Sequence, residues 1–419
     1  MRNLAIAAAL LLAGLVPTAR AGELPATTPA QAGLSTQRIA AIGPLMEQYV
    51  KDGRLAGSVT LVARDGRVVA LEAVGMRDRE SASPMQPDSI FRIASQSKAI
   101  VSVAVLMLMD EGRLLLSDPL HKYFPEFREL QVAVPREDGG YDLVKANRPV
   151  TLRDLLTHTS GISYGYGPAA VEWRQAGIQG WYFADRDEPI AATVARMGAL
   201  PLDAQPGERW VYGFGTDILG AVVEKASGQP LDRFLHTRIF EPLGMVDTQF
   251  YLPVEKAGRL AAVYAVNDGG LERAPDTGGP MGQGAYVDGP RKSLSGGAGL
   301  TSTAMDYARF LQMLLNGGEL DGRRLLSRKT VELMTANHVG DRYEPGRGFG
   351  LGVSVLLDLG ARGEPGSVGE FGWGGAYHST YWVDPEEKLV VVHLTQTLPA
   401  GDVDDYGRLR ALVYGAFSD

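Results

Sequence analysis

The start of the chain has a clear pattern of apolar and polar positions. Residues 35–50 carry apolar side chains at helical spacing, behind a serine and a threonine that can cap a helix. Residues 58–63 and 68–74 are β-like, and Asp65-Gly66 lies between them. Because Asp-Gly readily adopts the tight turn of a hairpin, the pattern predicts a helix followed by a two-stranded hairpin.

Residues 99–109 are apolar on every side. Such a run is typical of a buried helix rather than of a surface helix, whose apolar residues would form a stripe. The run begins directly after Lys98 and ends near Glu111-Gly112. We therefore expect a helix that passes through the interior of the protein.

The pattern of apolar and polar positions changes twice along the rest of the chain. Between about residues 116 and 290, short helical patterns alternate with long loops rich in glycine and proline. The helices predicted there are 152–157, 190–197, 217–226 and 231–239. Further on, the pattern predicts a helix over 303–315, strands over 352–357, 378–383 and 389–395, and a last helix over 403–417.

The β-like segments thus lie at both ends of the chain, with a helical block between them. This order predicts an α/β fold of the α+β type, with one antiparallel sheet flanked by helices and a mostly helical second lobe. We expect residues 22–115 and 291–419 to form the sheet domain and residues 116–290 the helical domain. A cleft between two lobes is a frequent place for an active site.

Residues 1–21 have the pattern of a secretory signal, with a charged start, an apolar core over residues 4–16 and the cleavage site Ala19-Arg20-Ala21. The core is too short to span a bilayer, so we expect a periplasmic or secreted protein without a stable membrane span. Removal of the segment takes away two arginines and changes the net charge from −8 to −10. An acidic chain without a basic tract argues against nucleic acid as a partner.

The composition narrows the chemistry further. The 419 residues include no cysteine, which rules out disulfides, thiolate metal sites and cysteine nucleophiles. The six histidines are dispersed without the spacing of metal ligands, so we expect no metal site, and no cofactor is implied. An exported protein without disulfides depends on its apolar core, and this chain is long enough to build one.

Ser95 and Lys98 are candidates for a nucleophile and its base. They are three residues apart, so on a helix they share one face and can touch. A serine hydroxyl becomes nucleophilic when a base takes its proton, and burial of a lysine disfavours its charged form. Ser-x-x-Lys occurs by chance in many chains, so the pair needs support from other residues.

Two other segments provide that support. Tyr212 lies in a glycine-punctuated turn that begins at Pro206-Gly207 and precedes a helix, and a tyrosine beside a cation can shuttle a proton. Trp373-Gly374-Gly375-Ala376 leads into a predicted strand. Glycines on an edge strand allow a substrate to approach the backbone, and free N–H groups can stabilise an oxyanion.

Taken together, Ser95-x-x-Lys98, Tyr212 and Trp373-Gly374-Gly375 occur in the order seen in serine β-lactamase-like hydrolases. The chain most resembles family VIII carboxylesterases, whose fold is that of class C β-lactamases and D-Ala-D-Ala carboxypeptidases. The resemblance covers roughly residues 36–415. Flanking segments that also match are Leu155 to Gly161, Ser295 to Leu300 and Tyr381 to Pro385.

The resemblance implies a role for each matched residue. Ser95 would attack the carbonyl carbon, and Lys98 and Tyr212 would share the proton transfers, first as base and then as acid to the leaving group. The backbone N–H groups of Ser95 and Ala376 would form the oxyanion hole. The sequence leaves open which of Lys98 and Tyr212 is the base, because the two would titrate as a coupled pair.

Two departures from the family pattern bear on the substrate. β-Lactamases and carboxypeptidases usually have Lys or His at the position of Trp373, and Asn at the position of Phe214. Without that cation and that amide, an anionic β-lactam is held less well than a small neutral ester. The expected substrate-binding residues are Trp373, Gly374, Gly375 and Phe214, together with His378, which could line the site or be a solvated residue of a strand.

We therefore expect a secreted serine hydrolase that cleaves a small-molecule ester through an acyl-enzyme, with its oligomeric state open. The same fold could instead serve a β-lactamase, a D-amino-acid peptidase or amidase, or a non-catalytic penicillin-binding-like sensor. A different nucleophile is also possible, because Gly161-Ile162-Ser163-Tyr164-Gly165 fits the Gly-x-Ser-x-Gly elbow of α/β-hydrolases. That elbow needs a strand before the serine and a helix after it, whereas residues 152–157 have a helical pattern.

Overall fold

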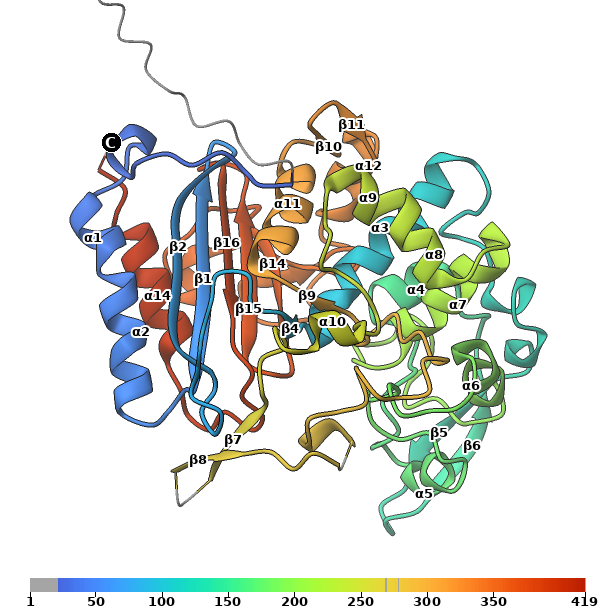
Figure 1. The fold of residues 1–419 in the computed structure, drawn as a ribbon. Coiled ribbons are helices and arrows are strands. Elements are labelled where there is room, and N and C mark those ends of the chain that lie inside the picture. Colours follow the sequence, from blue (N-terminus) through green and yellow to red (C-terminus); the bar gives the residue numbers. More distant parts are fainter. Residues whose placement is uncertain (1–21, 268–269, 278, 419) are drawn as a thin grey trace, which may run out of the picture.

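The computed structural model describes residues 22–267, 270–277 and 279–418, so the predicted signal segment 1–21 lies outside the described residues. An eight-stranded antiparallel sheet forms the centre of the molecule, with the strand order β12-β13-β14-β15-β16-β1-β2-β3 (Figure 1). Its strands are β1 (Gly57–Arg64), β2 (Arg67–Asp78), β3 (Ser83–Pro84), β12 (Arg347–Phe349), β13 (Ser354–Leu356), β14 (Phe371–Gly375), β15 (Ser379–Asp384) and β16 (Leu389–Leu394).

The two ends of the chain meet in the middle of this sheet. β1 pairs with β16 from Val59 opposite Leu394 to Arg64 opposite Leu389. This confirms the predicted fold class, in which the β segments at both ends share one antiparallel sheet. Every residue of β16 is buried, because helices cover both faces of the sheet, and the strand therefore reads as a continuous apolar run.

The first hairpin has the predicted turn. Asp65 and Gly66 both have left-handed backbones, with φ of 52° and 73°. Positive φ at both central residues is the signature of the type I′ turn, whose twist matches that of the flanking strands. The Asp-Gly signal therefore places the turn between β1 and β2 correctly.

Helices pack on both faces of the sheet (Figure 1). α2 packs on β2, with α14 beside it, while α11 packs on β16 and β1 from the other side, where the buried helix α3 also lies. The helices are α1 (Thr36–Ala40), α2 (Ile42–Lys51), α3 (Ser97–Asp110), α4 (Leu152–Leu156), α5 (Ala170–Gln175), α6 (Ile190–Met197), α7 (Gly215–Ser227), α8 (Leu231–Leu235), α9 (Glu241–Leu243), α10 (Val254–Ala257), α11 (Ala304–Leu315), α12 (Arg328–Met334), α13 (Leu359–Arg362) and α14 (Asp405–Tyr414). Within the described residues, no helix is long and apolar enough to cross a membrane.

The helix predicted over residues 35–50 is divided in two. Ser35 caps it as expected, since its side chain accepts a hydrogen bond from the backbone N–H of Arg38. α1 ends at Ala40 and α2 begins at Ile42, however. The reason is Pro44, which has no N–H to donate to the carbonyl of Ala40 and therefore cannot continue one helix through this point.

Short hairpins accompany the helices between residues 116 and 290, namely β5 (Gln131–Pro135) with β6 (Tyr141–Lys145) and β7 (Tyr264–Asn267) with β8 (Gly270–Arg273). β7 is tied to the chain end that follows β16. The N–H of Tyr264 donates to the carbonyl of Gln396, and the N–H of Leu398 donates to the carbonyl of Tyr264. The division into a sheet domain and a helical domain stays a prediction, and this part of the range 116–290 lies against the sheet.

Two more strand pairs are β4 (Phe91–Arg92) with β9 (Thr301–Ser302) and β10 (Glu319–Leu320) with β11 (Arg323–Arg324).

The strand that carries the Trp-Gly-Gly segment is not an edge strand of the sheet. β14 lies between β13 and β15, but β13 pairs only with Phe371 and Gly372. Within the described chain, residues 373–375 therefore have a strand partner on one side only, which is β15. The edge-strand prediction is thus wrong for the beginning of β14 and holds for its second half, because β13 is too short to cover it.

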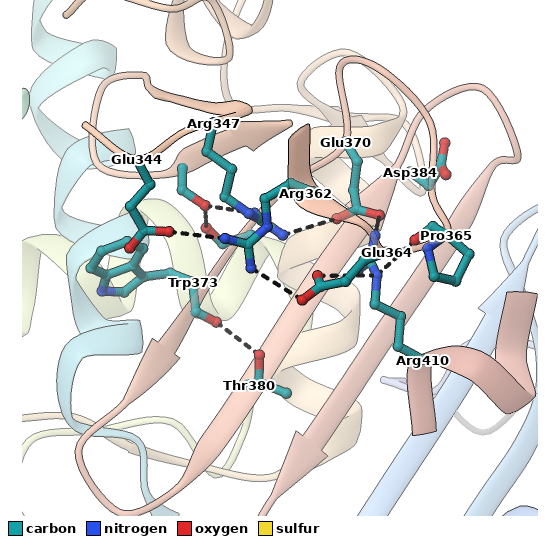
Figure 2. A network of polar contacts seen from close by, with 12 residues as sticks. Glu344, Arg347, Arg362, Glu364, Pro365, Glu370, Trp373, Thr380, Asp384 and Arg410 are labelled. Carbon is teal, nitrogen blue, oxygen red and sulfur yellow. Dashed lines mark hydrogen bonds and ion pairs between the residues drawn. The ribbon is translucent and has the colours of Figure 1, made fainter. Parts of the chain in front are cut away.

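A network of charged side chains anchors the beginning of β14 (Figure 2). Glu370, directly before β14, is 1% exposed, and its carboxylate lies 2.5 Å from the guanidinium of Arg410 on α14. The hydroxyl of Tyr414 also donates to Glu370, and Arg410 donates to the carbonyl of Pro365. A buried ion pair of this kind is costly to break, because the partner that remains is left charged and without compensation.

We expect Arg410→Met to lower the free energy of unfolding by about 3 kcal/mol, since it removes the closer of two ion-pair partners of the buried Glu370 carboxylate and leaves Arg347 at 3.9 Å. Urea denaturation followed by circular dichroism measures the change. Arg408→Met is the matched control on the same helix, because Arg408 pairs with Asp404 in a solvent-exposed bridge. The control should cost less than about 1 kcal/mol, and equal losses in the two variants would contradict the anchoring role of Glu370.

Candidate active site

Ser95 is the one accessible residue in a buried stretch. It lies in a 3₁₀ turn, Ala94–Gln96, at the beginning of α3. All residues from 89 to 108 except Ser95 are buried. The preceding Ala94 has a φ of 42°, a left-handed backbone that is unfavourable for alanine. This strained turn presents the Ser95 hydroxyl at the surface of a cavity while α3 passes into the core.

Lys98 has three polar partners although it is only 1% exposed. Its Nζ lies 3.2 Å from Ser95 Oγ, 3.0 Å from Tyr164 Oη and 2.8 Å from the carbonyl oxygen of Gly297. An ammonium group has three N–H donors, and three acceptors surround it here. The structure thus brings Ser95 and Lys98 into direct contact, as their spacing in the sequence predicts.

Tyr212 lies in the same site, next to Lys98 rather than next to Ser95. Lys98 Nζ is 4.7 Å from the centre of the Tyr212 ring. The Tyr212 hydroxyl accepts a hydrogen bond from the indole N–H of Trp373, at 3.2 Å. The predicted tyrosine and the predicted tryptophan are therefore joined to each other.

Tyr164 connects these groups, and its role is not predicted from the sequence. Its hydroxyl accepts a hydrogen bond from Lys98, and its ring meets that of Tyr212 edge to face at 5.5 Å. Burial raises the pKa of Tyr164 well above its ordinary value, and the neighbouring Tyr212 raises it further. Tyr164 is therefore a neutral phenol that lies between Lys98 and Tyr212.

The loop that accepts the third hydrogen bond of Lys98 is held by a buried carboxyl group. Asp217 Oδ1 accepts from the Ser295 hydroxyl at 2.5 Å and from the backbone N–H of Gly297 at 3.1 Å. Burial raises the pKa of Asp217, while Lys98 and these two hydrogen bonds oppose that rise. Asp217 thus positions the Gly297 carbonyl that accepts the hydrogen bond from Lys98.

Aromatic rings surround the Tyr212 side of the site. Trp210 stacks on Tyr212 with an interplanar angle of 8°, and the imidazole of His158 lies 4.7 Å from the Tyr212 ring. Burial, and next the charge of Lys98, lower the pKa of His158 well below its ordinary value. His158 is therefore a neutral packing residue.

The second half of β14 lies against the turn that carries Ser95. A Cβ atom added at Gly375 would come within 2.6 Å of the carbonyl oxygen of Ile93, so this close approach requires glycine. In the described part of the chain, the backbone N–H groups of Ser95 and Ala376 donate to no other backbone group. Both residues line the cavity, so both N–H groups are available to a bound oxygen atom.

The cavity next to Ser95 has a volume of about 420 Å³. Four of the five predicted substrate-binding residues line it, and Phe214 does not. Phe214 is fully buried, and its ring packs against Tyr164 at 5.0 Å. The prediction for Phe214 is corrected accordingly, because the ring supports Tyr164 from behind instead of facing a substrate. The lining residues are Ser95, Tyr164, Trp181, Tyr212, Trp373, Gly374, Gly375, Ala376, His378, Ser379, Ala400 and Tyr406.

Ser163 does not have the surroundings of a nucleophile elbow. The segment before it contains helix α4 rather than a strand, and the next helix, α5, begins only at Ala170. Its side chain is buried and accepts a hydrogen bond from the backbone N–H of Gly165. The glycine-rich segment is therefore a turn that places the adjacent Tyr164 in the site.

A protein-family model described as Beta-lactamase matches residues 43–415 of this chain. The chain belongs to this family.

Other members resemble the chain over most of its length. Protein Rv1367c of Mycobacterium tuberculosis is 34% identical in an alignment of 376 residues that covers 84% of this chain and 88% of that protein. Esterase EstB of Burkholderia gladioli is 35% identical over 381 residues, covering 86% of this chain and 91% of that protein. The solved structure of EstCE1, a hydrolase with promiscuous acyltransferase activity, has a TM-score of 0.76 and 29% identity, covering 90% of this chain and 99% of that chain. These likenesses confirm the predicted serine β-lactamase-like family and fold.

We expect Tyr164→Phe to slow the labelling of Ser95 by a fluorophosphonate about tenfold, because Lys98 loses one of its three hydrogen-bond acceptors. The rate is read from the mass shift of the intact protein over time. Tyr166→Phe is the matched control, since Tyr166 is 70% exposed and lies two residues away. If both variants are labelled as fast as the wild type, Tyr164 has no part in the reactivity of Ser95.

Proposed function

We propose that this Beta-lactamase family member is a serine carboxylesterase that cleaves short-chain esters through an acyl-enzyme. The observation that carries the proposal is the contact between the accessible Ser95 hydroxyl and the buried Lys98 amine, 3.2 Å apart at the wall of the cavity. The names of the relatives EstB, an esterase, and EstCE1, a hydrolase, agree with this reaction class.

In the proposed first step, Ser95 Oγ attacks the ester carbonyl carbon and its proton passes to the Lys98–Tyr212 pair, which holds one proton fewer at this point, as a neutral Lys98 amine or a Tyr212 phenolate. Tyr164 supports this pair, because its hydroxyl accepts a hydrogen bond from Lys98 and its ring contacts that of Tyr212. The carbonyl oxygen becomes an oxyanion, which the N–H groups of Ser95 and Ala376 stabilise. Removal of one such donor typically lowers the rate about 100- to 1,000-fold.

Collapse of this intermediate breaks the bond to the alcohol oxygen, which takes up the proton held by Lys98 and Tyr212. The acyl group is then bound to Ser95 Oγ as an ester. In the second half of the reaction a water molecule repeats the attack, its proton passes to the same pair, and Ser95 leaves with a proton as the carboxylic acid is released.

Neutral esters suit the Trp373 side of the cavity better than β-lactams do. Trp373 carries no charge, and its one N–H group already donates to Tyr212. A β-lactam carboxylate at this wall would therefore find no cation and no free indole donor, and would lose a charge-assisted hydrogen bond. We also propose that the protein is exported, because residues 1–21 have the pattern of a secretory signal.

We expect wild-type protein to gain the mass of one fluorophosphonate adduct, and Ser95→Ala to gain none, because among the serines that the structure describes only Ser95 contacts a buried lysine amine. Ser163→Ala is the control and should be labelled like the wild type. Labelling that depends on Ser163 would assign the nucleophile to the elbow motif. A wild type that is not labelled would favour a non-catalytic sensor.

We expect kcat/KM for p-nitrophenyl butyrate to exceed that for nitrocefin by at least about tenfold, because Trp373 offers no charge-assisted hydrogen bond to the β-lactam carboxylate. Initial rates on the purified protein, followed by absorbance, measure both values. A larger value for nitrocefin would make the protein a β-lactamase rather than an esterase.

A further inference from the structure

His378 stands on the cavity wall in a backbone conformation that histidine rarely adopts. It lies between β14 and β15 with a φ of 57°. A non-glycine residue in this left-handed region costs about 1–2 kcal/mol. Contacts on both sides hold it there, since the Thr395 hydroxyl donates to its carbonyl oxygen and its ring stacks on Tyr406 at 4.2 Å. Strain that persists in this way often marks a functional position.

The imidazole of His378 is fixed by a buried carboxylate. Its Nε2 lies 2.7 Å from Asp405 Oδ1, and Asp405 is fully buried at the beginning of α14. Burial by itself would raise the pKa of Asp405, but hydrogen bonds from His378 and His393 outweigh it and hold the pKa well below its usual range. Asp405 is therefore an anion in the protein interior.

The Asp405 carboxylate also accepts a hydrogen bond from the backbone N–H of Tyr406, and the two histidines are its ion-pair partners in the described part of the chain. His393 Nε2 lies 3.2 Å from Asp405 Oδ2, and His393 Nδ1 lies 2.7 Å from the Thr60 hydroxyl. A neutral His393 satisfies both contacts, with Nε2–H donating to Asp405 and Thr60 donating to Nδ1. No group of three residues suited to holding a metal ion occurs in the described residues, so direct hydrogen bonds account for the arrangement.

Of the two histidines, His378 is the one that lines the cavity, so its ring can stand between Asp405 and a bound ligand. Its Nε2 is occupied by Asp405, and within the described residues no hydrogen bond involves its Nδ1. His378 is also the only Lys, Arg, His, Asp or Glu among the residues that line the cavity. An ionisable group on a wall that otherwise carries no ionised side chain can distinguish substrates by charge.

We propose that His378, held by Asp405, binds a carboxylate that the substrate carries away from its scissile ester bond. The inference rests on the proposed esterase function and names the substrate class, which is half-esters of dicarboxylic acids or esters of carboxylate-bearing alcohols. When the substrate binds, its carboxylate and Asp405 lie against the two ring nitrogens and together favour a second proton on His378, whose Nδ1–H then donates a charge-assisted hydrogen bond to the substrate carboxylate. His378 and Trp373 lie at different places on the wall, so a cation at His378 is compatible with poor binding of β-lactams beside Trp373.

The test compares anionic and neutral esters of matched size by kcat/KM. One arm places the charge on the acyl side, with 4-nitrophenyl hemiglutarate against 4-nitrophenyl pentanoate. The other arm places it on the alcohol side, with 4-carboxyphenyl butyrate against 4-carbamoylphenyl butyrate. His378→Asn removes the charge and keeps a residue that tolerates positive φ. We expect the ratio of kcat/KM for the anionic ester to kcat/KM for the neutral ester to fall about tenfold in one of the two comparisons. That comparison identifies whether His378 binds a carboxylate on the acyl side or on the alcohol side of the ester.

His378→Gly, which suits the same backbone, is expected to lower the ratio equally, so the test does not depend on the folding of one variant. His236→Asn is the matched control, because His236 is an exposed histidine remote from the cavity lining, and its ratio should equal that of the wild type. A ratio that changes less than twofold in both arms in the folded His378 variants would overturn the inference. Failure of the wild type to cleave any of the neutral esters would instead overturn the proposed function.

Discussion

The site is organised by the need to satisfy one buried amine. Lys98 is almost completely excluded from solvent, and its three acceptors come from three segments that are far apart in the sequence. These are the Ser95 turn, the glycine-rich turn that carries Tyr164, and the loop that ends in Gly297. A buried polar group without partners costs several kcal/mol, roughly 1–3 for each unsatisfied donor. Any folded arrangement that satisfies Lys98 therefore also assembles the nucleophile and its neighbours.

The sheet supplies the second half of the site. β14 is held at its beginning by the buried Glu370–Arg410 pair (Figure 2). Its open half lies against the Ser95 turn. The short β13 leaves that half without a partner on one side, so the strand offers backbone groups to a ligand while its neighbours keep it rigid. Rigid placement of N–H donors is what an oxyanion hole needs, because the donors then require no reorganisation during the reaction.

The cavity wall is not uniform, and this bears on which esters the protein accepts. Around Tyr212 the wall is aromatic and uncharged, and the hydrogen-bonding groups of Tyr212 and Trp373 are directed to each other. At His378 the wall instead carries an imidazole that a buried carboxylate holds in place. A pocket with one charged donor among aromatic rings can bind an apolar body and orient a single anionic group.

The sequence by itself determined the fold class, the hairpin turn, the buried helix and the residues Ser95, Lys98, Tyr212 and Trp373, because each depends on local patterns or on short motifs. Only the tertiary structure decided how these residues meet. From the sequence alone, Tyr164 is one aromatic residue in a glycine-rich loop, and Phe214 is predicted to contact the substrate. Asp405 is simply a residue near the start of the last predicted helix. Their roles depend on which segments pack together, because burial and hydrogen-bond partners come from residues dozens to hundreds of positions away, and no local pattern encodes those distances.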